Sequence, residues 1–166
     1  MKLYKYFILL ALYSCSSDIQ IKKINNWSVK YNNDDIPASV PGNIFMDLLS
    51  NKMIPDPFIF NNEDSVQWVH EKKWEYISLF NVNYQMLKQD EQILQLKGLD
   101  TYANVYLNDS LILEADNMFR CWEIPVKNIL KKENELKIIF KPTKNIETKK
   151  IKKLGYELPW VESMFL

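Results

Sequence analysis

The sequence predicts an all-β protein, a β-sandwich of jelly-roll type with one short helix. Two observations predict this fold class. Six or seven segments alternate apolar and polar residues with the period of two typical of half-buried strands, and only one segment places apolar residues at helical spacing. The chain has 166 residues and a formal net charge of zero, which fits one globular domain. The balanced charge gives no electrostatic reason to expect a nucleic-acid partner.

The first 14 residues are predicted to be an export signal. Lys2 and Lys5 provide a short positive region, which an apolar run from Tyr6 to Tyr13 follows. This run is too short to cross a bilayer as a helix, for which about 20 residues are needed. The segment from Leu12 to Cys15 resembles a bacterial lipobox, in which the cysteine is lipidated and becomes the mature N-terminus. The alternative is an ordinary cleaved signal with an incidental cysteine.

A lipid anchor at Cys15 implies an exported, membrane-anchored lipoprotein of a bacterium, facing either the periplasm or the cell exterior. Each buried methylene of an acyl chain contributes about 0.8 kcal/mol to membrane binding, so several chains give stable anchoring. Residues 15–24 are then a polar tether. With Cys15 lipidated only Cys121 is left, so no intrachain disulfide is expected.

The elements of the first half follow from periodicity and turn residues. A strand is predicted from Trp27 to Tyr31, closed by the turn residues Asn32 to Asp35. Two prolines and a glycine hold the segment from Ile36 to Gly42 extended or looped. Next, Asn43 is expected to cap a short helix that ends at about Ser50. Prolines then predict a loop from Met53 to Glu63.

The second half is richer in predicted strands. The clearest runs from Trp74 to Tyr84, because five aromatic or β-branched residues share one face of it. Three more strands are expected at Ile93–Leu96, Cys121–Val126 and Leu136–Phe140, with one possible helical turn at Lys127–Lys131.

A β-hairpin is predicted between these strands. Its arms are Ala103–Leu107 and Leu111–Leu113, and the intervening Asn108-Asp109-Ser110 supplies residues that tolerate left-handed backbone geometry. Gly98 marks the entry to the hairpin, where a glycine readily adopts a positive φ, and Asp100 is expected to stabilise that turn.

The predicted sandwich therefore spans residues 25–143. Residues 144–166 are expected to form a linker and a truncated continuation of the sandwich, since Lys144 to Lys153 is rich in lysine and is typical of a solvated linker or exposed loop.

Residue types that support metal or nucleophilic chemistry are few. Cys121 adjoins Trp122 in an apolar run and is expected to be a buried thiol. The single histidine, His70, lies in a charged segment with no second His or Cys at metal-ligand spacing. We therefore expect no metal, no cofactor and no cysteine nucleophile.

A series of short motifs between Trp27 and Phe140 resembles the N-terminal, galactose-binding-like domain of the β-mannosidases of glycoside hydrolase family 2. Each motif is weak alone, but their order and spacing over more than a hundred residues make the resemblance fairly specific. They are Val40-Pro41-Gly42, Asp47-Leu48, Ile54-Pro55-Asp56-Pro57-Phe58, Asn62-Glu63, Trp68-Val69, Trp74-Glu75-Tyr76, Gly98 to Ala103, Leu107-Asn108, Asn117-Met118-Phe119 and Asn134-Glu135-Leu136.

The resemblance implies hydrolysis of terminal β-mannosyl residues, with β-mannosides as partners, but by a larger protein. Retaining glycosidases need two carboxyl groups roughly 5 Å apart. In this family both are glutamates of a (β/α)₈ barrel, which takes about 250 residues. The resemblance also implies a Trp-Asp-Trp-Gly segment shortly after a stretch like Pro159 to Ser163, and the sequence has none before Leu166. No catalytic residue is therefore assigned to this chain.

Several polar and aromatic residues have both a structural and a sugar-binding interpretation. Glu63 and Asp64 are expected to satisfy backbone donors in their loop, with sugar contact as the alternative. Asn117 is expected to fix a strand entry by side-chain hydrogen bonding together with core packing of its neighbours. Trp68 and Trp74 suit stacking on a sugar, but their neighbours favour interior packing.

Three functional hypotheses remain at this point. The chain is the N-terminal part of an exported β-mannosidase, inactive without its barrel. Alternatively it is a stand-alone carbohydrate-binding lipoprotein, or a structural or partner-docking domain without sugar affinity.

Overall fold

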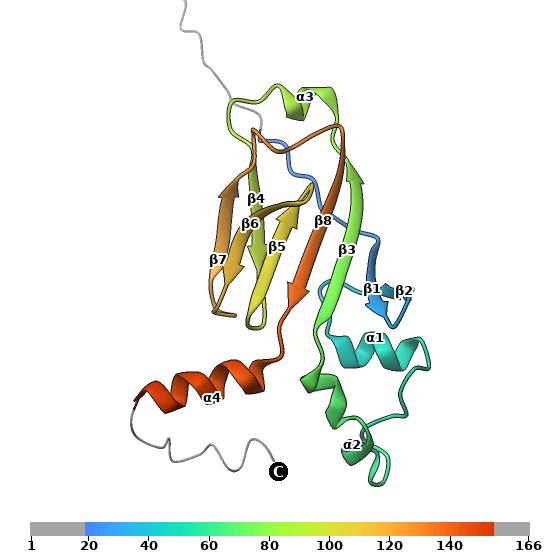
Figure 1. The fold of residues 1–166 in the computed structure, drawn as a ribbon. Coiled ribbons are helices and arrows are strands. Elements are labelled where there is room, and N and C mark those ends of the chain that lie inside the picture. The colour runs from blue at the N-terminus through green and yellow to red at the C-terminus, as the bar shows by residue number, and fades with distance from the viewer. Residues whose placement is uncertain (1–18, 155–166) are drawn as a thin grey trace, which may run out of the picture.

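The computed structural model describes residues 19–154 (Figure 1). Eight strands dominate it: β1 (Trp27–Tyr31), β2 (Asp34–Ala38), β3 (Trp74–Asn81), β4 (Ile93–Lys97), β5 (Ala103–Leu107), β6 (Ser110–Ala115), β7 (Cys121–Pro125) and β8 (Glu133–Phe140). The helices are α1 (Ile44–Ser50), α2 (Asn62–Ser65), α3 (Tyr84–Leu87), α4 (Thr143–Leu154) and the 3₁₀ helix η1 (Gln67–Glu71). None of the helices in this part of the chain is long and apolar enough to cross a membrane.

The strands form two antiparallel sheets. Six of them make a large sheet in the order β2-β1-β3-β8-β5-β6, and β4 pairs with β7 in a small sheet. Figure 1 shows the small sheet beside β5 and β6, while α1 lies near β1 and β2 at the other end of the large sheet. The predicted all-β sandwich is confirmed.

The core lies on one face of the large sheet, where buried side chains of neighbouring strands stand opposite one another. Val29 pairs with Tyr76, Tyr76 with Ile138, and Ile138 with Val105. All four side chains are buried. The small sheet and α1 cover this face with an apolar set that comprises Leu48, Leu94, Leu96, Trp122 and Ile124. The alternation read from the sequence therefore places the core correctly.

The hairpin between β5 and β6 turns where its sequence predicts. Asn108 and Asp109 have φ values of 49° and 65°, as a tight hairpin turn requires. The Asn108 amide donates to the Asn134 side-chain oxygen at 2.9 Å, and that oxygen also accepts from the Lys131 backbone N–H at 2.8 Å. Because Asn134 is buried, its amide ties the hairpin turn to the loop before β8.

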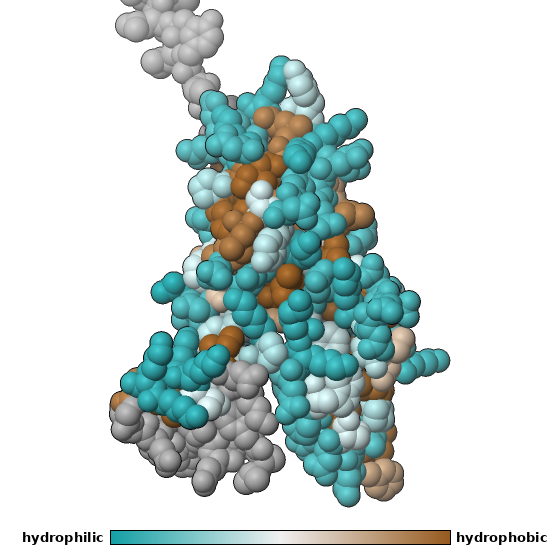
Figure 2. Space-filling model, viewed as in Figure 1, coloured by the Kyte–Doolittle hydropathy of each residue, from teal (hydrophilic) through white to brown (hydrophobic). Residues whose placement is uncertain are grey.

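The prediction of a single short helix is wrong, and the lysine-rich tail shows why. Residues 144–153 are predicted to be a linker or loop, whereas the structure forms α4 there. Lysine and glutamate are good helix formers, so a segment can be strongly polar and still helical. Figure 2 shows α4 at the lower left with a mainly hydrophilic surface. Lys150 places its ammonium 4.5 Å from the centre of the Tyr102 ring, which joins the helix to the end of the sandwich.

Two strand boundaries also differ from the sequence prediction. The turn after β1 is confined to Asn32 and Asn33, and the chain returns at once as β2, which pairs with β1 from Asp34 to Ala38. Pro37 is accommodated because β2 is the edge strand of its sheet. At the other boundary, β3 ends at Asn81, and Asn83 caps the short helix α3 by accepting from the Met86 backbone N–H at 2.8 Å.

Candidate functional site

Helix α1 begins where the sequence predicts and positions one wall of a surface pocket. The Asn43 side chain accepts a hydrogen bond from the Met46 backbone N–H at 3.0 Å, which satisfies a free donor at the helix start. Leu48 is fully buried against the core, so the opposite side of the helix faces outward with Met46 half-exposed. This orientation follows from the helical spacing of the apolar residues.

A buried carboxylate locks α1 and the loop before it to the large sheet. Asp47 Oδ1 accepts from the Ser39 backbone N–H at 2.8 Å, and Oδ2 accepts from the Tyr76 hydroxyl at 2.7 Å. Burial of Tyr76, with the hydrogen bond to Asp47 as the second cause, raises the pKa of its hydroxyl above the ordinary value. Both carboxylate oxygens are satisfied, so this cluster holds the structure and leaves no lone pair aimed at a ligand.

The same loop is tight enough to require a glycine. A Cβ on Gly42 would lie 2.2 Å from the Ser39 carbonyl oxygen, a distance at which the backbone would have to move. Sequence reasoning missed the Asp47 cluster. The available signal was a carboxylate directly beside the apolar Leu48 on a short helix, where a buried and paired acid is the physical requirement.

Next to this anchor lies a pocket with a volume of about 420 Å³. Segments from α1, the α1–α2 connection, α2 and η1 form its walls. Its apolar lining is Phe45, Met46, Pro57, Phe58 and Val66, and its polar lining is Asn43, Glu63, Gln67 and His70. We call this the α1–η1 pocket. Figure 2 shows apolar residues gathered at the lower right of the molecule, where the α1–α2 connection lies in Figure 1.

The pocket combines aromatic faces with polar side chains. The rings of Phe45 and His70 lie 4.9 Å apart between centres and are tilted by 57°. Phe58 is 94% exposed at the rim, although its backbone N–H is held by the Asp56 carboxylate at 3.0 Å. Gln67 donates to the Glu63 backbone carbonyl at 3.2 Å, which fixes η1 against α2.

This arrangement suits binding of a neutral sugar. Aromatic rings stack on the apolar faces of sugars, and carboxylate, carboxamide and imidazole groups bond to their hydroxyls. Glu63 is the one carboxylate among the described lining residues, whereas glycoside hydrolysis uses two at a set separation. The pocket can therefore hold a ligand but lacks the pair of acids that the reaction needs.

The two predicted tryptophans belong to the interior rather than to a sugar platform. Trp74 is buried and donates to the Val69 carbonyl at 2.9 Å. Tyr31 stacks on it at 6.4 Å between centres. Trp68 is half-buried, and the Lys72 ammonium covers one of its faces at 4.5 Å from the ring centre. Interior packing is thus confirmed for Trp74, and the uncovered area of Trp68 is small.

The remaining predicted residues are scattered. Asp64 is exposed in the first turn of α2 and does not line the pocket, whereas Glu63 does. Asp100 is exposed and accepts from the Thr101 hydroxyl, next to Gly98 with φ at 70°. The structure therefore brings Glu63 and His70 into one pocket and leaves both aspartates outside it.

Two sequence predictions near β7 need correction. Asn117 does accept from the Phe119 backbone N–H at 2.8 Å, as expected, but Phe119 is 88% exposed, so the predicted core packing is absent. Cys121 is exposed, not buried. In β7 the core-facing residues are Trp122 and Ile124, so alternation turns Cys121 outward.

Two further predictions concern the ends of the chain and metal binding. Cys15, the predicted lipidation site, and the segment from Pro159 to Ser163 lie outside the described residues. Within residues 19–154 no group of three or more His, Cys, Asp or Glu side chains is placed to hold a metal ion.

Comparison with known proteins identifies the family of this fold. Residues 27–165 match the family described as glycosyl hydrolase 2 galactose-binding domain-like. Beta-mannosidase B of Thermothelomyces thermophilus is 43% identical over 107 residues, which are 63% of this chain and 12% of that protein. Beta-mannosidase of Capra hircus is 31% identical over 141 residues, covering 80% of this chain and 16% of that protein.

Solved structures agree with the sequence relatives. The crystal structure of β-D-mannosidase from Dictyoglomus thermophilum matches 83% of this chain and 17% of its own, with 37% identity and a TM-score of 0.79. The exo-chitosanase CsxA of Amycolatopsis orientalis shares the fold at a TM-score of 0.62 and 15% identity. The chain thus spans less than a fifth of the length of these relatives. The chain belongs to the galactose-binding-like domain family of glycosyl hydrolase family 2.

Proposed function

We propose that this chain serves as the N-terminal, non-catalytic β-sandwich of a β-mannosidase-like glycoside hydrolase. The observation that carries the proposal is the likeness to the β-D-mannosidase of Dictyoglomus thermophilum, at 37% identity and a TM-score of 0.79. A 166-residue chain with this sandwich has no space for a (β/α)₈ barrel of about 250 residues. Its role is then to support a catalytic domain that supplies both carboxyl groups.

The first prediction concerns activity. The purified 166-residue chain is expected to show no turnover of a chromogenic β-mannoside. A chimera, in which residues 27–154 replace the equivalent domain of the Dictyoglomus enzyme, is expected to retain activity within about tenfold of that enzyme, because the barrel still carries the chemistry. The Dictyoglomus enzyme with that domain deleted is the control, and we expect it to be inactive or insoluble. Turnover by the chain alone, or a chimera no better than the deletion variant, would contradict the proposal.

A second candidate function is direct carbohydrate binding, which the composition of the α1–η1 pocket favours. Phe58 presents a nearly free ring beside Glu63, Gln67 and His70. This grouping suits a neutral β-mannoside, whose ring can stack on phenylalanine while its hydroxyls meet the polar side chains. Such a site would hold substrate near the enzyme without taking part in bond cleavage.

The variant Phe58→Ala tests this second function. It is expected to weaken binding of β-1,4-mannobiose by about five- to tenfold, because one aromatic stacking contact is worth about 1 kcal/mol. Phe119→Ala is the matched control, since Phe119 is similarly exposed but lies outside the pocket. Isothermal titration of both variants makes the comparison. If wild-type protein does not bind mannobiose, or both variants lose affinity equally, the pocket is not the binding site.

A further inference from the structure

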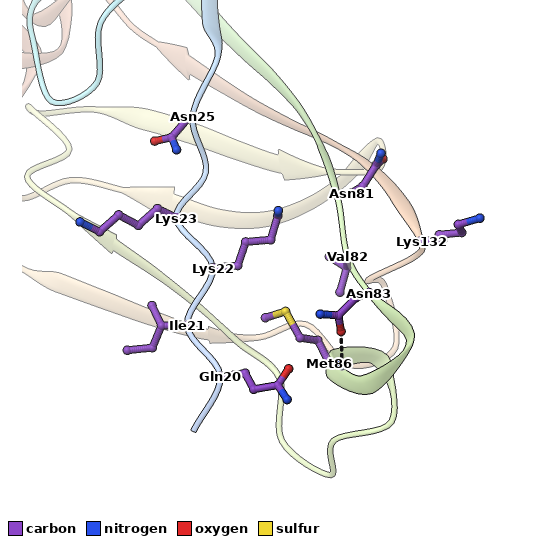
Figure 3. A pocket seen from close by; sticks show the side chains of 10 residues that line it. All are labelled: Gln20, Ile21, Lys22, Lys23, Asn25, Asn81, Val82, Asn83, Met86 and Lys132. Atoms are coloured by element: carbon purple, nitrogen blue, oxygen red, sulfur yellow. Dashed lines mark hydrogen bonds between the residues drawn. The ribbon is translucent and has the colours of Figure 1, made fainter. Parts of the chain in front are cut away.

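A second hollow, with quite different chemistry, lies at the opposite end of the sandwich from α1. It has a volume of about 850 Å³ and is widely open to solvent. Its walls come from segments far apart in the sequence: the extended stretch from Gln20 to Asn25, the end of β3 with the start of α3, and Lys132 just before β8 (Figure 3). We call it the lysine groove.

The groove is a defined structure because its N-terminal wall is pinned to the sheet. The buried Ser78 hydroxyl donates to the Asn25 carbonyl at 2.7 Å, and the Trp27 indole N–H donates to the Ile24 carbonyl at 3.1 Å. On the facing wall, the buried Val82 donates its backbone N–H to the Lys132 carbonyl at 2.8 Å. Both walls are therefore held by hydrogen bonds to the core strands.

Three ammonium groups and several carboxamides line this groove. Lys22, Lys23 and Lys132 form no ion pair with any described carboxylate, and the lining contains no acidic residue. The side chains of Asn25 and Asn81 make no hydrogen bond within the described part of the chain. The groove thus offers uncompensated positive charge beside free amide donors and acceptors.

The positions of the lysines indicate the shape of the ligand. Figure 3 shows Lys22 reaching from the N-terminal stretch toward the end of β3, with Lys23 and Lys132 on the two outer sides. Cations spread in this way do not converge on a single small anion. They match an extended molecule that carries repeated negative charges.

Other nearby charges do not cancel this field. Asp90 is paired with Lys127 at 3.4 Å, away from the lining. Glu133 follows Lys132 directly but lies in the strand pair opposite Asn81 and forms no ion pair within residues 19–154. The groove also lacks an aromatic side chain, in contrast to the α1–η1 pocket, so a neutral sugar has no ring to stack on there.

We propose that the lysine groove binds an acidic polysaccharide, a chain of uronic acid residues, through Lys22, Lys23 and Lys132. The ammonium groups meet successive carboxylates, and the carboxamides of Asn25 and Asn81 bond to sugar hydroxyls. Amides that suit hydroxyls, set in a concave groove, favour a glycan over a flat anionic membrane. The site is separate from the α1–η1 pocket and does not depend on the mannosidase assignment.

The experiment is a titration of the purified chain with tetra-β-1,4-D-mannuronate, using neutral β-1,4-mannotetraose as the reference sugar. We expect binding of the acidic sugar only, weakened several-fold when NaCl rises from ~0.05 M to ~0.3 M because screening shortens the range of the charges. The triple variant K22Q/K23Q/K132Q is expected to lose affinity by about tenfold or more. Lys22→Gln alone should give a smaller loss in the same direction.

The matched control is K52Q/K73Q/K97Q, which removes the same charge from exposed lysines outside the groove. It should lose less than about twofold, which separates a site from general attraction to a basic surface. Thermal unfolding of both triple variants shows whether each is folded. Equal losses in the two variants, equal binding of mannotetraose, or no binding of the acidic sugar would each overturn the proposal. So would binding to phosphatidylglycerol vesicles or duplex DNA in place of the uronate.

Discussion

Replacing Leu136 with alanine is expected to lower the free energy of unfolding by about 2–5 kcal/mol. Leu136 has no solvent-exposed area, and it lies on β8 between Ser78 of β3 and Leu107 of β5. Truncation would remove several buried methyl and methylene groups and leave a cavity in the centre of the large sheet. Because domains of this size are stable by only about 5–15 kcal/mol, the loss would be a large fraction of the total.

Urea denaturation followed by circular dichroism measures this loss, as a lower midpoint with an unchanged slope. Leu79→Ala is the matched control. Leu79 belongs to the adjacent strand β3 but is 68% exposed on the other face of the sheet, so its truncation should cost no more than about 0.5 kcal/mol. Comparable losses for the two leucines would show that the core lies on both faces, contrary to the layer arrangement described above.

The strands and their buried faces could be predicted because a half-buried strand leaves a two-residue period in the sequence. The hairpin at Asn108 and the capped helix at Asn43 were likewise predictable, since their turn and cap chemistry is local. Helix α4 was not, because its lysines are compatible with both a solvated loop and a helix. Only contact with η1 and with Tyr102 decides between them.

The sites were harder to predict than the fold for a related reason. The α1–η1 pocket joins Phe45 to His70 across some 25 residues, and nothing local to either residue signals the other. The lysine groove depends on the N-terminal stretch folding back along β3, which brings Lys22 and Asn81 to one place. Sequence periodicity describes one element at a time, whereas both hollows are formed between elements.

Replacing Tyr76 with phenylalanine is the second change expected to have a large effect. The variant would leave Asp47 Oδ2 buried without its hydrogen-bond donor, at a cost of about 1–3 kcal/mol near neutral pH. Packing of the ring is preserved, including its edge contact with Phe140 at 5.7 Å. A smaller loss than from Leu136→Ala is expected, because no cavity forms.

The pH dependence of this loss identifies its cause. Burial raises the pKa of the Tyr76 hydroxyl in the folded protein, whereas in the unfolded chain this group titrates near pH 10. Above about pH 10 the unfolded state therefore releases a proton that the folded state retains, and the wild type loses about 1.4 kcal/mol of stability per pH unit from this group. Tyr76→Phe lacks the group, so its deficit should shrink as the pH rises from 9 to about 11.

Urea denaturation of both proteins at each pH measures this narrowing gap. Tyr84→Phe is the matched control because Tyr84 is 69% exposed, and its difference from wild type should stay small and constant over the same range. A Tyr76→Phe deficit that stayed parallel to the wild type up to pH 11 would mean that the hydroxyl ionises as easily in the folded protein as in the unfolded chain. The Asp47 cluster would then be open to water, and the loop from Ser39 to Asn43 would lose its buried anchor.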